Sequence, residues 1–394
     1  MYFSSWLRNR TTTARANRAA SLRQPPAAPR RSARRFRPRI EILEDRCVPS
    51  AGFLDPTFNT TGVVTAPVDG GGPYAVAIYA PGTANAGKIV SVGLGGLARF
   101  NPDGSLDATF GNGGIVNQSS WTGADVALVG DKILASGTAL LNAKGRVDFE
   151  IARFNSDGSL DQTFGTNGTV LTAFGGKSRL SDSETSAMAV QADGKIVVAG
   201  IALVPINNEN RVFEGFAVAR YTPNGVLDTT FGNNGEMLIA VGPSVNPPDG
   251  LALSGNSIDL VGHSYSNIYV VQLTAAGQLD PNFGTGGVVN VGQGFAPSLT
   301  AQGDGKLVVV SYNASSPAGI HVTRLLANGS PETGFGTGGT ATVPWSITGT
   351  FYSEAVKVDP LGRFVIGGYQ PSYTDINFVV IRLTSAGGII PSPI

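Results

Sequence analysis

The sequence of 394 residues lacks several features that would assign it to a familiar class of protein. It contains one cysteine, Cys47, so an intrachain disulfide is excluded and stability has to come from the burial of apolar side chains. We expect Cys47 to be an inert thiol. No run of 18 or more apolar residues occurs, which excludes an ordinary membrane-spanning helix.

Histidine is almost as scarce, because His263 and His321 are the only two. Neither belongs to a His-x-His or His-Glu-x-x-His motif, the spacings typical of metal ligands. The sequence also has no Gly-x-Ser-x-Gly motif, the nucleophile elbow of many hydrolases. We therefore expect both histidines in loops or at strand ends, although these absences leave Ser-His-Asp catalysis open.

The charge is balanced overall but unevenly distributed. Residues 1–50 carry twelve arginines, no lysine and three acidic residues, a net charge of +9. Residues 51–394 carry 16 basic and 25 acidic residues, a net charge of −9. An acidic body repels phosphates rather than releasing counterions from them, which argues against nucleic acid or an anionic membrane as its partner.

The basic N-terminal segment does not resemble a folded domain. Residues 7–39 are rich in Arg, Ala, Ser and Pro, and they contain too few apolar residues to offset the entropy of ordering the backbone. The apolar core of an ordinary secretory signal is missing. We interpret residues 1–50 as a disordered leader and residues 51–394 as one folded domain.

A short motif ending in Phe, usually Phe-Gly, recurs six times along the rest of the chain. Its phenylalanines are spaced 52, 54, 67, 52 and 52 residues apart, and a period near 50 is the signature of a stacked or radial repeat. The six copies are Leu54–Phe58, Leu106–Gly111, Leu160–Gly165, Leu227–Gly232, Leu279–Gly284 and Pro331–Gly336.

Each repeat reads as four short strands. Between residues 166 and 231, short apolar or alternating runs are separated by Gly, Asp and Asn, and Asp193-Gly194 is typical of a β-hairpin turn. No helix signal occurs. Four strands per repeat of about 50 residues indicate a blade of a β-propeller, with a β-solenoid as the alternative. The four runs are 168–172, 187–191, 196–200 and 216–221.

The count of repeats predicts how the ring closes. The first copy, Leu54–Phe58, is only the end of a repeat, and that end is missing after residues 378–388. We therefore predict an all-β, six-bladed propeller of four-stranded blades, closed by pairing the N- and C-terminal pieces. Leu54 and Phe58 should pack beside residues 378–388 and contribute roughly 1.5–3 kcal/mol each.

The repeat resembles the delta-60 repeat (DUF5122-type) family. The shared motif is Ala-Arg-Phe-Asn-x-Asp-Gly-Ser-Leu-Asp-x-Thr-Phe-Gly, with Asp-Gly-Lys-Ile-Val-Val-Ala-Gly upstream, and it extends over 51–394. The resemblance implies a propeller and no assigned activity. The fourth repeat departs from the motif with Gln272 for Arg, and the fifth with Pro331-Glu332 for Leu-Asp.

The leader has a resemblance of its own. Arg37–Ser50 contains Leu-Glu-Asp-Arg followed by Pro-Ser. It is similar to the leader segment at the N-termini of large exported proteins of planctomycete bacteria. This resemblance implies export to the cell surface or the medium.

Two sets of repeated polar residues have a structural interpretation. An arginine on the fourth strand precedes an acidic residue by eight positions, which predicts structural ion pairs across the turn. Asn and Asp at positions 1, 3 and 7 of two turns would also suit a calcium loop, but four repeats lack this pattern. The ion pairs are Arg99 with Asp107, Arg153 with Asp161, Arg220 with Asp228, and Arg324 with Glu332. The calcium candidates are Asn101, Asp103, Asp107, Asn155, Asp157 and Asp161.

The loop between the third and fourth strands varies most in length, and all six copies should emerge on one face. In the last three repeats this loop and its flanks combine aromatic, amide and histidine side chains, which suit stacking on sugar rings and hydrogen bonding to hydroxyls. The predicted ligand-binding residues are His263, Tyr265, Tyr269, Tyr312, Asn313, His321, Tyr369, Gln370, Tyr373 and Asp375.

These observations favour an exported or cell-surface propeller that binds a protein or glycan without catalysis. We expect a monomer that needs no cofactor and binds no nucleic acid. The alternative is a propeller-type enzyme, a hydrolase such as a lactonase or a sugar oxidoreductase, with a metal at the mouth of the channel.

Overall fold

The computed structural model describes ten stretches of the chain, and all regular structure in them is β-strand. This confirms the all-β prediction. No helix in these stretches is long and apolar enough to cross a membrane. The leader, residues 1–50, lies outside them. The stretches are 57–60, 64–68, 73–141, 147–174, 182–205, 212–242, 246–314, 318–344, 352–371 and 376–388.

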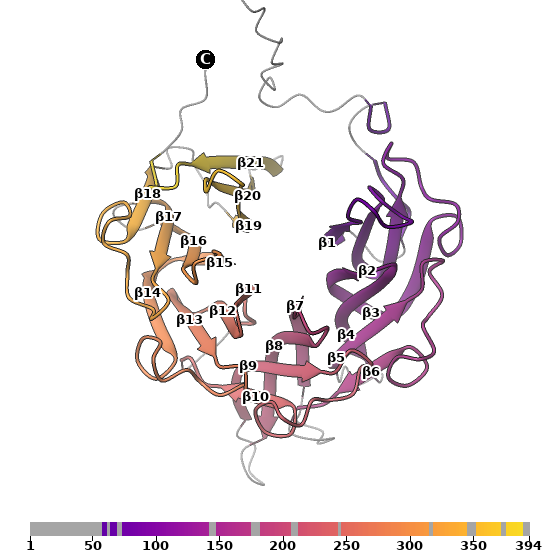
Figure 1. Cartoon of the computed structure of the whole chain (residues 1–394), viewed down its shortest axis with the longest axis horizontal. Helices are drawn as coiled ribbons and strands as arrows, with labels where there is room; N and C mark the ends of the chain where they lie inside the picture. The colour runs from indigo at the N-terminus through magenta and orange to yellow at the C-terminus, as the bar shows by residue number, and fades with distance from the viewer. Residues whose placement is uncertain are drawn as a thin grey trace, which may run out of the picture. The chain divides into compact units, whose positions relative to one another are not determined.

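The strands form five antiparallel sheets that follow one another around a common centre (Figure 1). The first sheet has six strands, and β6 lies at its outer edge, paired with β5. Its strands are β1 (Pro73–Ile78), β2 (Ile89–Phe100), β3 (Ile115–Val129), β4 (Lys132–Leu140), β5 (Val147–Phe154) and β6 (Thr169–Thr172).

Three sheets of four strands come next. The second contains β7 (Asp182–Val190), β8 (Ile196–Pro205), β9 (Val212–Tyr221) and β10 (Glu236–Ile239). The third contains β11 (Gly250–Ser254), β12 (Ser257–Ser264), β13 (Asn267–Leu273) and β14 (Val288–Gln293). The fourth contains β15 (Phe295–Ala301), β16 (Leu307–Asn313), β17 (Gly319–Leu325) and β18 (Thr340–Pro344). The fifth sheet has three strands, β19 (Tyr352–Val358), β20 (Phe364–Pro371) and β21 (Ile376–Leu383).

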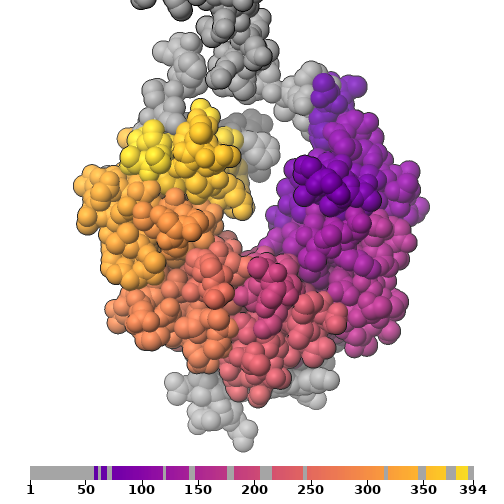
Figure 2. Space-filling view, viewed as in Figure 1, coloured from indigo at the N-terminus to yellow at the C-terminus, as the bar shows by residue number. Residues whose placement is uncertain are grey.

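The sheets therefore differ from the six closed, four-stranded blades that the sequence predicts. The first reason is β3, which pairs with β2 through its first residues and with β4 through its last ones, so that two repeats share one sheet. The second reason is β21, whose outer edge pairs with no strand of the described stretches. The ring is open at this point, and Figure 2 shows the first sheet and the fifth sheet standing apart on the viewed face.

A tight turn in each repeat covers the phenylalanine of the repeat before it. Gly158 closes one such turn with φ +87°, and a Cβ there would lie 2.8 Å from the Gly111 nitrogen and 3.1 Å from the Phe110 ring. Only glycine adopts this positive φ without strain and leaves space for the neighbouring backbone and ring. The Gly111 amide donates to the Asp157 carbonyl at 2.7 Å, which fixes the turn on its neighbour.

The core lies between successive repeats. We call the residue two positions before the repeated Arg (Gln272 in the fourth repeat) the third-strand position: Leu97, Ile151, Val218, Val270, Val322 and Val380. We call the corresponding apolar residue on the innermost strand of each repeat the inner-strand position: Val76, Val126, Met188, Leu251, Leu299 and Val356. Each of five apolar clusters joins a third-strand position to the inner-strand position of the next repeat.

The sixth such contact is missing. Val380 is 74% exposed, whereas the other five third-strand positions are fully buried. Val76, which would face it, is 64% exposed. An apolar surface therefore lies on each side of the opening.

The N-terminal segment lies against the first sheet. Phe58 would contact a Cβ at Gly104, and the Asn59 amide donates to the Asp103 carbonyl at 2.6 Å. These are the contacts that Phe110 and Gly111 make with the following turn. The predicted packing of Phe58 beside residues 378–388 is not seen, and Leu54 lies outside the described stretches.

Candidate functional site

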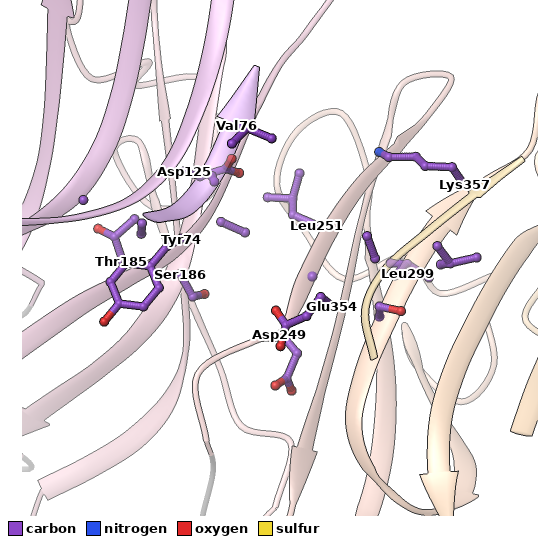
Figure 3. A pocket seen from close by; sticks show the side chains of 18 of the residues that line it. Tyr74, Val76, Asp125, Thr185, Ser186, Asp249, Leu251, Leu299, Glu354 and Lys357 are labelled. Atoms are coloured by element: carbon purple, nitrogen blue, oxygen red, sulfur yellow. The ribbon is translucent and has the colours of Figure 1, made fainter. Parts of the chain in front are cut away.

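A cavity of about 740 Å³ lies at the centre of the ring, and it is lined by the innermost strands of all five sheets (Figure 3). Its wall contains residues of six innermost strands: β1, β3, β7, β11, β15 and β19. Its lining therefore combines residues that are far apart in the sequence.

The innermost strands of the first, second, fourth and fifth sheets each contain a β-bulge beside this cavity. A bulge inserts one extra residue, and next to functional sites it re-aims a side chain. We call the position inside the bulge, or its equivalent directly before β11, the bulge register. The residue at the bulge register varies among the repeats, and all of these residues except Pro297 line the cavity: Tyr74, Ala124, Ser186, Asp249, Pro297 and Glu354. The bulges lie between Pro73 and Ala75, Gly123 and Asp125, Thr185 and Ala187, Phe295 and Ser298, and Ser353 and Ala355.

Asp249 and Glu354 form an acidic pair on one side of the cavity, where Figure 3 shows them as neighbours. Desolvation by the surrounding protein raises the pKa of both carboxyl groups, and the charge of Asp249 raises the pKa of Glu354 further. The Nδ1 atom of His263 lies 3.0 Å from Asp249 Oδ2. His263, a residue predicted from sequence, thus reaches the cavity through its contact with Asp249.

Ser298 lies on β15, which contacts both β11, the strand directly after Asp249, and β19, the strand that carries Glu354. It lines the cavity, yet only 4% of it is exposed. Its hydroxyl has no hydrogen-bond partner among the described stretches of the chain. The oxygen itself is buried in the wall, and a buried hydroxyl without a partner is unfavourable.

Asp125 is a third carboxylate of the lining, and it is held by the backbone. It accepts hydrogen bonds from the amides of Val126 at 2.8 Å and Met188 at 2.9 Å, so it ties β3 to β7. Desolvation raises its pKa, while these hydrogen bonds and the charge of Lys357 act in the opposite direction. Among the described residues, Lys357 is the one basic residue that lines the cavity.

Aromatic residues lie next to the acidic pair. The rings of Tyr352 and Tyr369 stack with centroids 5.0 Å apart and an angle of 12° between their planes. Desolvation and the charge of Glu354 raise the pKa of Tyr369. The predicted residues His263, Tyr312 and Tyr369 occupy the same register on β12, β16 and β20.

Among the described residues, none of the predicted ligand-binding residues lines the cavity itself. Tyr265 is 65% exposed in a turn at φ 52°, and Tyr269 packs against an apolar cluster between the second and third sheets. Asn313 donates from Nδ2 to the Gln293 carbonyl at 2.9 Å, and His321 is half-buried in β17.

Three predicted residues remain without a side-chain position. Gln370 belongs to β20, but its side chain lies outside what the structure describes, as do Tyr373 and Asp375 entirely. Sequence reasoning also missed Asp249, Glu354 and Ser298. The signal that could have found them is the variation of one inner-strand register in an otherwise regular repeat.

The repeated arginines and acids form ion pairs. The Nε–Oδ2 distance is 2.7 Å for Arg99 and Asp107 and 2.9 Å for the pairs of Arg153 and Arg220, and Arg324 pairs with Glu332. Each guanidinium also lies 4.4–4.7 Å from the ring centroid of its repeat's phenylalanine. The acids paired with Arg153 and Arg220 are Asp161 and Asp228.

The same arginines connect neighbouring repeats. Each donates from Nη1 to a backbone carbonyl in the turn of the next repeat, in Ser156, Pro223, Ala275 and Ser385. The hydrogen bond from Thr163 outweighs desolvation and, with Lys132 and Arg153, holds the pKa of Asp161 well below its usual range. These carboxylates are therefore engaged within the scaffold.

The fourth repeat replaces this arrangement. Gln272 donates from Nε2 to Asp259 Oδ1 at 2.7 Å, and Ser254 donates to the other carboxylate oxygen at 2.5 Å. Burial raises the pKa of Asp259 to about 6, and these two hydrogen bonds only partly offset it. All three residues belong to the third sheet, which therefore buries a carboxyl where the other repeats have an arginine pair.

The calcium candidates take part in turn hydrogen bonds. Asp103 Oδ1 accepts from the amide and the hydroxyl of Ser105, and Asp157 Oδ1 accepts likewise from Ser159. Asn101 and Asn155 each donate to the same serine hydroxyls. Within the described stretches there is no group of three or more His, Cys, Asp or Glu side chains that could hold a metal ion.

Comparisons with known proteins concern the fold. No curated protein matches the chain. The propeller domain of the Trilobed protease from Pyrococcus furiosus, which has an open velcro topology, is 10% identical with a TM-score of 0.37, and the match covers 76% of each chain. Prolyl oligopeptidase B from Galerina marginata is 12% identical with a TM-score of 0.41, over 81% of this chain and 44% of that one.

A protein of unknown function from Dyadobacter fermentans is 12% identical with a TM-score of 0.37, over 75% of this chain and 91% of that one. The repeats themselves have a family match. Four segments match the family described as domain of unknown function (DUF5122) beta-propeller, which supports the delta-60 repeat resemblance: residues 86–110, 131–164, 191–231 and 302–335.

Proposed function

We propose that this chain is a non-catalytic binding protein, exported to the cell surface or the medium, that holds a protein or glycan ligand over its central cavity. The observation that carries the proposal is the varied lining of that cavity within a regular scaffold. The arginine–acid pairs and the glycine turns recur from repeat to repeat, but the bulge register does not. A surface that varies on a constant framework is where recognition evolves.

The stacked pair of Tyr352 and Tyr369 supports a glycan as the ligand. Aromatic rings pack against the apolar faces of sugars, and the adjacent carboxylates of Glu354 and Asp249 accept hydrogen bonds from hydroxyl groups. A protein loop with polar and apolar side chains would use the same contacts.

Binding of the purified full chain to a glycan array and to a peptide array tests this role. We expect selective binding that Tyr369→Ala weakens at least tenfold, because the substitution removes one ring of the stack. Tyr265→Ala, which truncates an exposed tyrosine away from the cavity lining, should change binding less than twofold. Equal losses in the two variants would contradict this assignment of the site.

The contact between Asp249 and His263 favours a second candidate, a hydrolase such as a lactonase or a sugar oxidoreductase with a metal at the channel mouth. A catalytic metal needs at least a third protein ligand, and the described residues around this pair do not supply one. Metal analysis of the purified chain separates the candidates. Stoichiometric tight binding of a transition metal would favour the enzyme.

We also propose that the ring closes in solution as six four-stranded blades. Val380 and Val76 are the two exposed members of otherwise buried sets, and in each other interface the same two positions share a cluster. Contact between β21 and the first sheet would cover both side chains. Phe58 already contacts the turn at Gly104 as the end of a preceding repeat would.

Hydrogen exchange tests the closure without a substitution. In β17 the Arg324 amide donates to the Gly339 carbonyl on the outer strand, and Arg382 is the equivalent residue of β21. A closed ring should protect residues 376–383 as strongly as residues 319–325. Exchange of the β21 amides within seconds would show that its edge stays open.

A further inference from the structure

We propose that residues 64–66 pair with β21 as the fourth strand of the last sheet, with Val64 opposite Val380. The inference rests on the proposed closure of the ring and deepens it, because it names the segment that makes the joint and the register in which it pairs. Residues 64–66 are described by the structure, but they belong to no strand there.

The outer strand supplies the same partner in every complete repeat. We call the residue six positions after the repeated phenylalanine the outer-strand position: Val64, Val116, Val170, Met237, Val289 and Ala341. In five repeats this residue pairs in register with the third-strand position. Val64 follows Phe58 and is the sixth member, and Val380 is the one third-strand position that lacks such a partner among the described residues. The repeat therefore assigns Val64 to Val380.

The packing of the other interfaces supports this pairing. Each of the five clusters between repeats contains an outer-strand position together with a third-strand and an inner-strand position. At the opening, Val64 and Val76 already line one apolar groove of about 410 Å³ on the first sheet. The missing third member is Val380, which is 74% exposed. Pairing of Val64 with Val380 would assemble the set that is buried in every other interface.

Residues 64–68 already have the burial pattern of a strand with one covered face. Val64, Ala66 and Val68 are half-buried, whereas Thr65 and Pro67 between them are exposed. A period of two is typical of β-structure. The outer edge of β21 presents the unpaired amides and carbonyls that such a strand would satisfy.

The backbone of Thr60 favours the same rearrangement. Its φ is 58°, in the left-handed region that is unfavourable for a β-branched residue. The equivalent residues Thr166, Thr285 and Thr337 do not have positive φ, and each forms the bridge from which an outer strand starts. If residues 64–66 join β21 through the same turn, Thr60 loses this strain.

Cysteine cross-linking of the full chain, in a Cys47→Ser background, tests the register. Opposite residues of antiparallel strands have Cα atoms about 4.5–5.5 Å apart, within the range that a disulfide bridges. We expect Val64→Cys with Val380→Cys to form an intramolecular disulfide under mild oxidation. The reference is Met237→Cys with Val218→Cys, the equivalent pair in the second sheet, and the two yields should agree within about twofold.

The control for the register is Thr65→Cys with Val380→Cys, because a shift of one residue moves a side chain to the other face of a sheet. This pair should stay reduced. Equal yields with Val64 and Thr65, or a disulfide that joins two molecules, would overturn the inference. Absence of the disulfide while the reference pair forms one would do the same.

Hydrogen exchange of the parent chain is a second measurement, independent of any substitution. Amides of residues 64–66 that bond to β21 should be protected together with residues 376–383. Protection of residues 376–383 with exchange of all amides of residues 64–66 within seconds would overturn this inference and leave the closed ring intact. Fast exchange in both segments would overturn the inference and the closure together.

Discussion

Val218 and Val380 are the same residue at the same register of two repeats, yet the first is fully buried and the second is 74% exposed. Their own sheets differ at the outer edge, because β9 pairs with both β8 and β10 whereas β21 pairs with β20 alone. The next repeat differs as well. Val218 shares a cluster with Leu251 of the third sheet, whereas nothing in the described stretches covers Val380. Burial in this molecule is therefore a property of pairs of repeats.

The polar residues show the same contrast. Arg220 is 4% exposed, pairs with Asp228, lies over Phe231 and donates to the Ala275 carbonyl of the next repeat. Arg382, at the equivalent position of β21, is exposed and forms no ion pair within the described stretches. An arginine of this kind contributes fully only when the following repeat is in place.

Removal of the buried guanidinium should have the largest effect. We expect Arg220→Ala to lower the free energy of unfolding by about 3–5 kcal/mol, because the buried Asp228 would keep only Lys195 as a charged partner and the Ala275 carbonyl would lose its donor. Urea unfolding followed by tryptophan fluorescence measures the change. Arg363→Ala is the control, since Arg363 forms a partly exposed pair with Asp359 and should cost less than about 1 kcal/mol. Similar losses in both variants would show that burial does not distinguish them.

Substitution of the equivalent residues Val218 and Val380 tests whether the ring is open in solution. We expect Val218→Ala to lower the free energy of unfolding by about 2 kcal/mol, from the loss of two buried methyl groups and the cavity they leave. If the ring closes in solution as proposed, Val380→Ala should have an effect of similar size. The same urea titration serves both variants. An effect of Val380→Ala within about 0.5 kcal/mol of zero would support the open ring instead.

The stability of the fourth repeat, which has Gln272 in place of the arginine, should depend on pH. Asp259 has a folded-state pKa of about 6, above its unfolded value, so the folded protein binds the extra proton and stability falls as the pH rises through 6. Between pH 5 and pH 7.5 this group should remove about 1.4 kcal/mol. Thermal unfolding at both pH values measures the loss, and Asp259→Asn should reduce it. If the pH dependence of the variant equals that of the parent chain, Asp259 is not its source.

Local patterns predicted the repeat because each one is set within a few residues. The Asp-Gly turns, the run of apolar strands and the eight-residue spacing from Arg99 to Asp107 depend on chain geometry alone. The boundaries between sheets do not depend on local chain geometry alone. In β3 the chain passes from one repeat to the next as a single strand, and only the pairing of its two halves shows that two repeats meet there.

The candidate site was predicted less well for a similar reason. Sequence reasoning favoured aromatic loops, and it found His263 and Tyr369 near the acidic pair. It missed Glu354 because a bulge changes which face of a strand a side chain occupies, so alternation along the sequence does not give its direction. It missed Asp249 because this residue lies directly before β11, outside the alternating run of the strand. Whether Ser298 has a hydrogen-bond partner depends on neighbouring sheets, which no local pattern describes.

The arginines of this scaffold recognise an oxygen atom of the main chain rather than a particular side chain. The residues that supply this carbonyl are a serine, a proline, an alanine and again a serine, and all four accept the same kind of hydrogen bond. Mutations at this turn position therefore leave the joint between repeats chemically unchanged. Copies of the repeat can drift apart in sequence, and exchange neighbours by duplication or recombination, while each still fits the turn that follows it.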